Sequence, residues 1–352
     1  MKINKNKLKI LFLINTQTSY QDDFFSELKK YANISVIFYD SNYKNYDFKI
    51  KNKNKNYHFL DQSINPSKYL IDIVKKINPD FTVIGGYRLP YISKLQNLFK
   101  LSKKKYFFWL ERLNNKSKFK IKIISFLIKY RIKKSNGILA VGNEAQNFYK
   151  NFHSNVVNLP YSISVPNKIR KNYFYNKKIN FTFVGQIIKR KGIDFILDSF
   201  NSLQDREKQK IKLTIVGNGS MEKEISTIIK KNNFIKHFKF LNKGKLSKIY
   251  QKSDVFLFPS RFDGWGVAPL EAMSYSNYLI LSKNIGMKEI LKSKNKILEI
   301  SNYKLTQTLK KLINKKINII KYGKLNKKIL KKSLCNVKNS SKHLINYLKT
   351  LS

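Results

Sequence analysis

The stretch Ser253–Met273 reads S-D-V-F-L-F-P-S-R-F-D-G-W-G-V-A-P-L-E-A-M. It begins with the apolar run 255–258, which is typical of a strand buried on both faces of a sheet. Pro259 ends this strand because proline has no N–H to donate to the ladder. The two glycines of the next loop permit backbone angles that other residues avoid, and Pro269 suits the start of a helix. This order predicts one strand–loop–helix unit of a parallel α/β sheet.

The same stretch has the parts of a ligand site. A helix start presents backbone N–H groups without partners, and these attract anions such as phosphate. Two carboxylates, Asp263 and Glu271, lie eight residues apart without a basic residue at helical spacing. We therefore expect both to face hydroxyl groups of a ligand. The alternative is an ordinary connection whose N-terminal acid complements the helix dipole.

Apolar runs alternate with helical periods along most of the chain, and the alternation stops once, near residue 165. Strands are expected at 8–14, 34–39, 81–84, 106–110 and 137–141, and again at 179–184, 213–216, 238–241, 255–258 and 278–281. This predicts two doubly wound α/β domains, each a parallel sheet covered by helices on both faces. Ligands of such sheets bind beyond the carboxyl ends of the strands, so we expect a site in a cleft between the two domains.

Composition narrows the class of protein. The formal charge of +50 suggests nucleic acid or an anionic membrane as partner. However, only seven of the 71 basic residues are arginine, the residue that contacts bases and phosphates in bidentate fashion. Nucleic acid is therefore not the expected partner, and compositional drift toward lysine is the alternative source of the charge. A hydrophobic content of 42% excludes a disordered chain.

The cysteine content and the lengths of the apolar runs indicate the cellular compartment of the protein and whether it binds a metal. The single cysteine, Cys335, cannot form an internal disulfide, which suits a reducing cytoplasm. It also excludes a cysteine-based zinc site, and the four histidines have no metal-ligand spacing. The longest apolar runs, 10–14 and 123–128, fall short of the roughly 20 residues that a membrane span needs. We expect a cytoplasmic protein without a bound metal.

The stretch resembles the donor-site signature of family 4 glycosyltransferases, also called group 1 glycosyltransferases, which is usually written E-x7-E. Asp263 stands at the first acid of that signature and Glu271 at the second. A second stretch, F-V-G-Q-I-I-K-R-K-G at 183–192, resembles the family's V-G-R-x-x-x-x-K-G motif. Lys191 matches the motif lysine, but Gln186 stands where the family has arginine, so Arg190 is the candidate for the second positive charge.

The resemblance implies a GT-B fold, in which two Rossmann-like domains face each other across a cleft. Residues 1–165 would form the N-terminal, acceptor-side domain and 166–330 the C-terminal, donor-binding domain, with a final helix in 331–352 packing back on the first. It implies transfer of a sugar from a nucleotide-sugar donor to an acceptor hydroxyl, with retention at the anomeric carbon and without metal or cofactor. The leaving phosphate would take the acceptor's proton, because no residue is assigned as general base.

The resemblance also assigns roles in the donor site. Lys191 would neutralise the donor diphosphate, Asp263 would hold hydroxyls of the donor sugar, and Glu271 would bind the ribose. Lys191 and Asp263 are the catalytic candidates. The full set of donor-site candidates is Gly185, Gln186, Arg190, Lys191, Gly217, Gly264, Trp265, Gly266, Val267 and Glu271.

The first domain has weaker signals. Tyr87 follows a glycine turn, and Glu111 follows an expected strand where many family members have a histidine facing the sugar. Both are candidates for the acceptor side. Pairing of Glu111 with Arg112 or a neighbouring lysine is the alternative. The segment Lys116–Lys134 mixes basic and apolar residues, so it would suit an anionic membrane surface or a helix packed on the sheet.

A glycan or lipid-linked acceptor would fit such a segment, as in the synthesis of surface polysaccharide, lipopolysaccharide or glycolipid. Two other functions stay open. One is a different nucleotide-sugar enzyme of the same fold, such as an epimerase or a phosphorylase-like enzyme. The other is a basic polyanion-binding protein.

Overall fold

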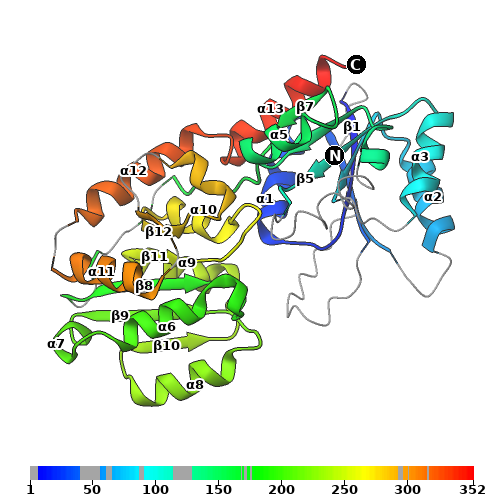
Figure 1. Cartoon of the computed structure of the whole chain (residues 1–352). Helices are drawn as coiled ribbons and strands as arrows, with labels where there is room; N and C mark the ends of the chain where they lie inside the picture. The colour runs from blue at the N-terminus through cyan, green and yellow to red at the C-terminus, as the bar shows by residue number, and fades with distance from the viewer. Residues whose placement is uncertain are drawn as a thin grey trace. The chain divides into compact units, whose positions relative to one another are not determined.

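The structure, a computed structural model, describes residues 7–39, 56–60, 66–86, 91–113, 129–167, 169, 173–174, 177–291, 296–299, 301–314 and 317–352. The chain divides into two compact units. Unit 1 comprises the residues up to Ser162 together with Val337–Ser352, and unit 2 is Ile163–Asn336. Each unit has its own sheet with helices packed on it (Figure 1).

Unit 1 contains a sheet whose seven described strands are all parallel. Winding reverses between β1 and β4, as in dinucleotide-binding folds. The strands are nearly continuous apolar runs because helices cover both faces; all five residues of 10–14, for example, are buried. In spatial order the strands are β3 (Tyr57–Phe59), β2 (Asn33–Phe38), β1 (Lys9–Ile14), β4 (Phe81–Gly85), β5 (Lys105–Leu110), β6 (Gly137–Ala140) and β7 (Val156–Asn158).

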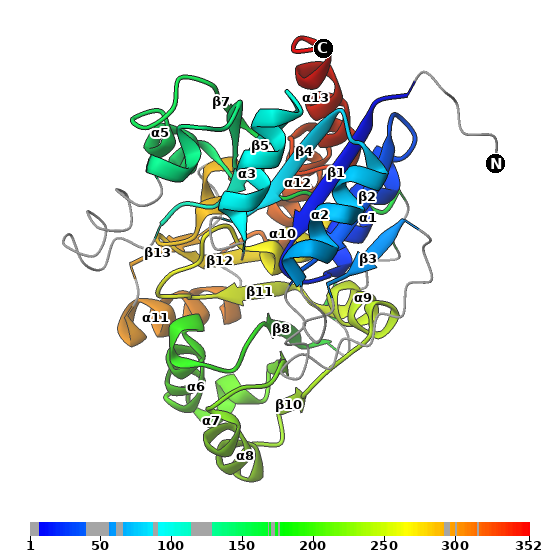
Figure 2. The same ribbon diagram turned by 90° about the vertical axis from the view of Figure 1, so that its right-hand side faces the viewer.

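Helices α1 (Ser19–Leu28) and α13 (Val337–Lys349) pack on each other and on one face of this sheet. Phe12 of β1 contacts Phe25 of α1, with ring centres 4.8 Å apart, and Phe107 of β5 contacts Tyr347 of α13 at 5.8 Å. Leu11 points to the opposite face, where it shares a buried cluster with residues of α2 (Pro66–Ile77) and α3 (Ile92–Leu101). Figure 2 shows α2 and α3 in front of the strands. Helix α5 (Asn143–Tyr149) connects β6 to β7.

Unit 2 repeats the architecture with six described parallel strands. Their order is β10 (Ile235–Phe238), β9 (Ile211–Val216), β8 (Ile179–Val184), β11 (Val255–Phe258), β12 (Tyr278–Ser282) and β13 (Lys296–Leu298). The reversal of winding falls between β8 and β11. The helices are α6 (Ile193–Asn201), α7 (Asp205–Lys208), α8 (Glu222–Lys231), α9 (Lys243–Lys252), α10 (Val267–Ser274), α11 (Asn302–Ile313) and α12 (Ile319–Lys332), with 3-10 turns η3 (Lys189–Lys191) and η4 (Gly286–Ile290).

Both faces of the unit 2 sheet are covered. Phe181 of β8 packs against Phe200 of α6, with ring centres 5.2 Å apart. Phe256 of β11 packs against Tyr250 of α9 at 5.9 Å. Because Phe256 is in register with Thr182, the residue after Phe181, the two phenylalanines point to opposite faces. Helices α6 and α9 therefore lie on opposite sides of the sheet.

The predicted fold class, two doubly wound α/β units, is confirmed. Strands β8 and β11 have the predicted bounds. The strand expected at 238–241 is wrong, because β10 begins at Ile235, which pairs with Leu213, and ends at Phe238 opposite the last residue of β9. Strands β3, β7 and β13 were not predicted, since three residues are too few to establish a period. No described helix is both long and apolar enough to cross a membrane.

Candidate active site

The candidate site lies at the carboxyl ends of β8 and β11, at the centre of the unit 2 sheet (Figure 1). The chain leaves these neighbouring strands toward opposite sides, and such a switch point is where open α/β sheets bind ligands. Lys191 ends the turn η3 that follows β8, and Asp263 lies in the loop that follows β11. The fold therefore brings together two residues that are 72 positions apart.

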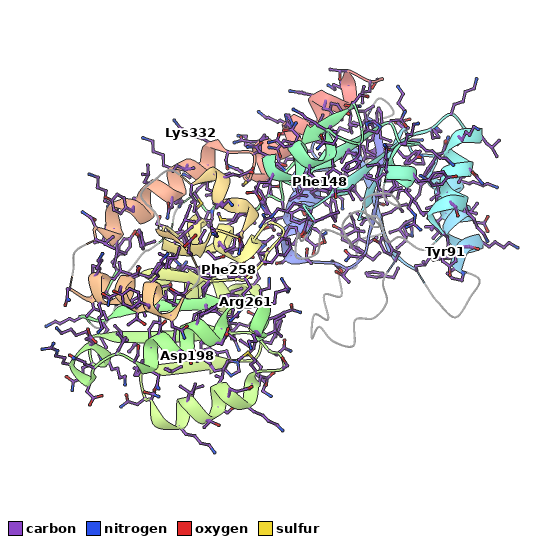
Figure 3. The ribbon with its side chains drawn as sticks, viewed as in Figure 1. Tyr91, Phe148, Asp198, Phe258, Arg261 and Lys332 are labelled. Atoms are coloured by element: carbon purple, nitrogen blue, oxygen red, sulfur yellow. The ribbon has the colours of Figure 1, made fainter. Side chains whose placement is uncertain are left out.

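Lys191 and Asp263 form an ion pair through the lysine ammonium and the carboxylate Oδ2. Their side chains are only 14% and 13% exposed. Asp263 Oδ1 also accepts the backbone N–H of Trp265 at 3.2 Å. The ammonium lies 5.2 Å from the ring centre of Phe258, which Figure 3 labels. Asp263 thus has a basic partner that helical spacing could not reveal, and an anion that binds Lys191 competes with this carboxylate.

Arg190 lies beside Gln186 and the loop after β11. Its guanidinium donates to the carbonyl of Phe262 at 3.0 Å and to Gln186 Oε1 at 3.4 Å. The carbonyl of Arg190 accepts the backbone N–H of Arg261 at 2.8 Å. The arginine of the family motif is missing at Gln186, and the guanidinium of Arg190 reaches the same place. The two candidates are therefore neighbours in space.

Two glycines permit close backbone approaches at this edge. Gly192 has φ +75, and a Cβ there would lie 2.0 Å from the carbonyl oxygen of Pro259. Gly217, after β9, has φ +144, and a Cβ would lie 1.8 Å from the carbonyl oxygen of Gly185. A side chain at either position would therefore push strand ends apart. These glycines shape the edge on which Lys191 and Gly185 lie.

Gly264, Trp265 and Gly266 form the loop before α10, whose first residue is Val267. The loop is fastened to the segment after β12: the N–H of Asp263 donates to the carbonyl of Asn284 at 3.1 Å, and Trp265 is buried. Helix α10 starts two residues before the predicted start. Its first turn has no acidic residue, and the alternative of an ordinary connection stays a prediction.

Glu271, in the second turn of α10, accepts a hydrogen bond on Oε2 from the hydroxyl of Tyr250 at 2.8 Å. Tyr250 is 2% exposed. Burial, together with the negative charge of Glu271, raises the pKa of the Tyr250 hydroxyl well above its ordinary value. Tyr250 was not predicted, because no spacing links a tyrosine of α9 to the E-x7-E signature.

Unit 1 has a cavity of about 320 Å³ at the carboxyl ends of β1, β4 and β5. Asn15, Gln21 and Glu111 are among its polar lining residues, and Trp109 and Tyr161 are among its aromatic ones. The two rings make an edge contact with centres 5.1 Å apart. This is again the switch point of a doubly wound sheet, so it is a second place where the fold favours a ligand.

Glu111 receives a hydrogen bond from the hydroxyl of Tyr161, and burial, with the charge of Glu111, raises the pKa of that hydroxyl well above its ordinary value. Arg112 forms an ion pair with Glu144 of α5, and the pairing of Glu111 with Arg112 or a neighbouring lysine stays a prediction. Tyr161 was missed, because it follows β7, which was itself not predicted.

Two further candidates fall partly or wholly outside the described residues. Tyr87 is a candidate that lies outside the described residues. Of the segment Lys116–Lys134, only 129–134 is described; there the side chain of Tyr130 is 67% exposed while Ile132 is buried, and the ammonium of Lys134 lies 4.6 Å from the Tyr130 ring centre. In the described part of the chain, no group of three or more His, Cys, Asp or Glu side chains could hold a metal ion.

Fold and site together define a class: an α/β protein of two Rossmann-like units, in which Lys191 and Asp263 meet at the switch point of the second unit. Residues 164–332 match the family described as "Glycosyl transferases group 1", and this range covers nearly all of unit 2. Unit 2 is therefore a group 1 glycosyltransferase domain, as the motifs at Lys191 and Asp263 predicted.

Similar proteins agree with this assignment. The capsular polysaccharide biosynthesis glycosyltransferase CapH of Staphylococcus aureus is 30% identical over 158 residues, which is 43% of this chain and 44% of CapH. The chain spans less than half the length of the first curated relatives it matches.

Among solved structures, the lipopolysaccharide outer core galactosyltransferase WaaB in its apo form has a TM-score of 0.73 at 14% identity, over 98% of this chain and 100% of WaaB. Anabaena HepE in complex with UDP and glucose has a TM-score of 0.75 at 12% identity, over 97% and 100%. At these identities the likeness concerns the fold, and it confirms the predicted GT-B class of two Rossmann-like domains.

Proposed function

We propose that the protein transfers a sugar from a nucleotide-sugar donor to an acceptor hydroxyl, with retention at the anomeric carbon. The observation that carries the proposal is the Lys191–Asp263 ion pair at the switch point of a group 1 glycosyltransferase domain. In the reaction, the bond from the acceptor oxygen to the anomeric carbon forms as the bond to the diphosphate breaks. The acceptor's proton leaves with the diphosphate.

Positive charge at the edge of unit 2 suits the departing diphosphate. Lys191 is largely withdrawn from solvent, where a charge acts more strongly than in bulk water. Arg190 lies next to Gln186 and adds a planar cation. Backbone N–H groups in the first turn of α10 have no acceptor within the helix. Together these groups stabilise negative charge that grows as the sugar leaves.

The two carboxylates, Asp263 and Glu271, would bind the uncharged parts of the donor, which are the sugar and the ribose. A carboxylate repels a diphosphate, so Asp263 serves best against hydroxyls of the sugar while Lys191 shifts toward the phosphates. Glu271, held by Tyr250, offers carboxylate oxygens for the ribose hydroxyls. This division assigns each charge of the site to the part of the donor that it attracts.

UDP is the first donor nucleotide to test, because HepE, which has the same fold, was solved with UDP and glucose. The acceptor suits unit 1, where the cavity has carboxylate and amide groups beside Trp109 and Tyr161. Such a lining fits a sugar, since its hydroxyls bind polar groups and its C–H faces pack on rings. CapH and WaaB support a surface glycan as the acceptor class.

Thermal-shift screening against UDP, GDP, ADP and their sugars tests the proposal, since a bound ligand raises apparent stability. We expect a shift with one nucleoside diphosphate and its sugars, and consumption of that sugar donor only when acceptor glycan is added. Conversion of the donor without acceptor would indicate an epimerase or related enzyme. Absence of any nucleotide shift, with retained polyanion binding, would contradict the proposal.

An anionic membrane surface is the proposed location of the acceptor. Support comes from residues 129–134, where exposed Tyr130 stands among four basic residues, a combination that favours the headgroup region. Co-sedimentation with phosphatidylglycerol vesicles, but not with phosphatidylcholine vesicles, is expected. Equal recovery with both lipids would contradict this part of the proposal.

A further inference from the structure

Tyr250 connects the interior of unit 2 to the edge where the donor would bind. Its hydroxyl donates to Glu271 Oε2 at 2.8 Å. Its ring stacks on Tyr275, with centres 5.7 Å apart and planes at 15°, and also packs against Phe256 of β11. Because the ring is buried between these neighbours, the hydroxyl has a fixed position. It therefore fixes the carboxylate that it contacts.

The phenol stays a donor throughout the ordinary pH range. Burial and the adjacent Glu271 charge raise the pKa of Tyr250 well above its usual value, so the hydroxyl keeps its proton. A carboxylate has about four acceptor positions on its two oxygens, and the phenol occupies one of them on Oε2. On ribose binding, the same carboxylate would accept the two hydroxyls of a vicinal diol while the Tyr250 hydroxyl holds its orientation.

We propose that Tyr250 is a positioning residue that orients Glu271 for the ribose diol of the donor nucleotide and so sets the preference for ribonucleotides over deoxy analogues. The inference rests on the proposed function, in which Glu271 binds ribose. A merely structural tyrosine would affect all nucleotides alike. Tyr250 instead acts through one carboxylate, and its effect depends on the hydroxyls that this carboxylate binds.

The test compares UDP with 2′,3′-dideoxy-UDP by calorimetric titration of the full chain. Tyr250→Phe keeps the ring and removes only the hydroxyl. We expect its affinity for UDP to fall about tenfold, as for loss of a hydrogen bond to a charged group, while its affinity for dideoxy-UDP stays unchanged. Tyr275→Phe removes a hydroxyl from the stacked neighbour and is the matched control, with both affinities as in wild type.

The ratio of the two affinities is measured within one preparation, so a partly unfolded variant does not distort it. A wild-type ratio in Tyr250→Phe overturns the inference, as does an equal loss for both nucleotides. Lys191→Ala, titrated in parallel, separates the inference from the proposed function. If Lys191→Ala loses UDP while Tyr250→Phe keeps the wild-type ratio, only the inference fails; if wild type binds no nucleoside diphosphate, both fail.

Discussion

The carboxyl edges of the two sheets share a topology and differ in chemistry. Each edge has a carboxylate that accepts a hydrogen bond from a tyrosine, Glu271 from Tyr250 in unit 2 and Glu111 from Tyr161 in unit 1. At the unit 2 edge, Lys191 pairs with Asp263 and the guanidinium of Arg190 lies beside Gln186. In unit 1, the cavity is lined by Trp109 and Tyr161 as well as by Glu111 and Arg112. One architecture thus presents two chemically different edges, which we propose serve the donor diphosphate in unit 2 and the acceptor sugar in unit 1.

The largest difference between the two edges should appear on removing the charge of Lys191. Lys191→Ala is expected to lower kcat/KM for sugar transfer about 100-fold, comparable to loss of one preorganised group that stabilises the leaving charge. Lys189→Ala removes an exposed lysine of the same turn and is expected to have nearly wild-type kinetics. Equal activity of the two variants would show that the charge of Lys191 is not used.

The ion pair of unit 2 gives a second, less intuitive prediction. Asp263→Asn removes the carboxylate that competes for Lys191, so UDP affinity is expected to rise roughly 3- to 10-fold as one like charge is removed from near the diphosphate. Transfer is expected to fall, since the sugar hydroxyls lose their carboxylate. Titration with UDP and initial rates check the two effects. Asp198→Asn on α6 serves as the control, and weaker UDP binding by Asp263→Asn would contradict the competition.

In unit 1 the expected effect is smaller and concerns the acceptor. Glu111→Gln keeps the size of the side chain and removes its charge, so the acceptor KM is expected to rise about tenfold, as for a weakened hydrogen bond to a charged group. The donor KM is expected to stay unchanged. Glu27→Gln, on the first helix, is the control for charge removal within unit 1. A change confined to the donor KM would contradict the proposal that unit 1 binds the acceptor and unit 2 binds the donor.

The smallest expected effect is on the pH dependence of folding stability, and it concerns a tyrosine at each of the two edges. Tyr161 and Tyr250 have pKa values raised above the ordinary 10.0 in the folded protein. Each therefore favours folding below about pH 10, and this contribution is lost as pH rises through the folded pKa, since the unfolded chain releases its proton first. Tyr161→Phe and Tyr250→Phe should each lose less stability than wild type between pH 9 and 11 in urea unfolding. A decline as steep as that of wild type would contradict the raised pKa values.

The sequence predicted unit 2 better than unit 1 for a physical reason. At its edge the backbone itself must turn and approach closely, so glycines appear at set distances from apolar strands, as at Gly192 and Gly217. The ion pair needs one residue from each of two such loops, and the motifs supplied both Lys191 and Asp263. Their direct contact was not predicted, because it depends on β8 and β11 being neighbours in the sheet.

The unit 1 cavity draws on residues from several strand ends, and no two of its polar groups have a spacing that marks a site. Glu111 was predicted from its position after a strand, whereas its partner Tyr161 comes from beyond a three-residue strand. Tyr250 in unit 2 could not be predicted as a site residue either, because the sequence pattern of a buried aromatic residue in a helix indicates only a core position. Long-range hydrogen bonds from these two tyrosines leave no periodic signal in the sequence.

The most direct measurement of the central claim is a crystal structure of the protein with UDP. We expect the diphosphate to lie against Lys191 and the first turn of α10, with the ribose hydroxyls on Glu271 and the Lys191–Asp263 ion pair loosened. UDP bound elsewhere, with that ion pair intact and no ribose hydroxyl on Glu271, would contradict this expectation.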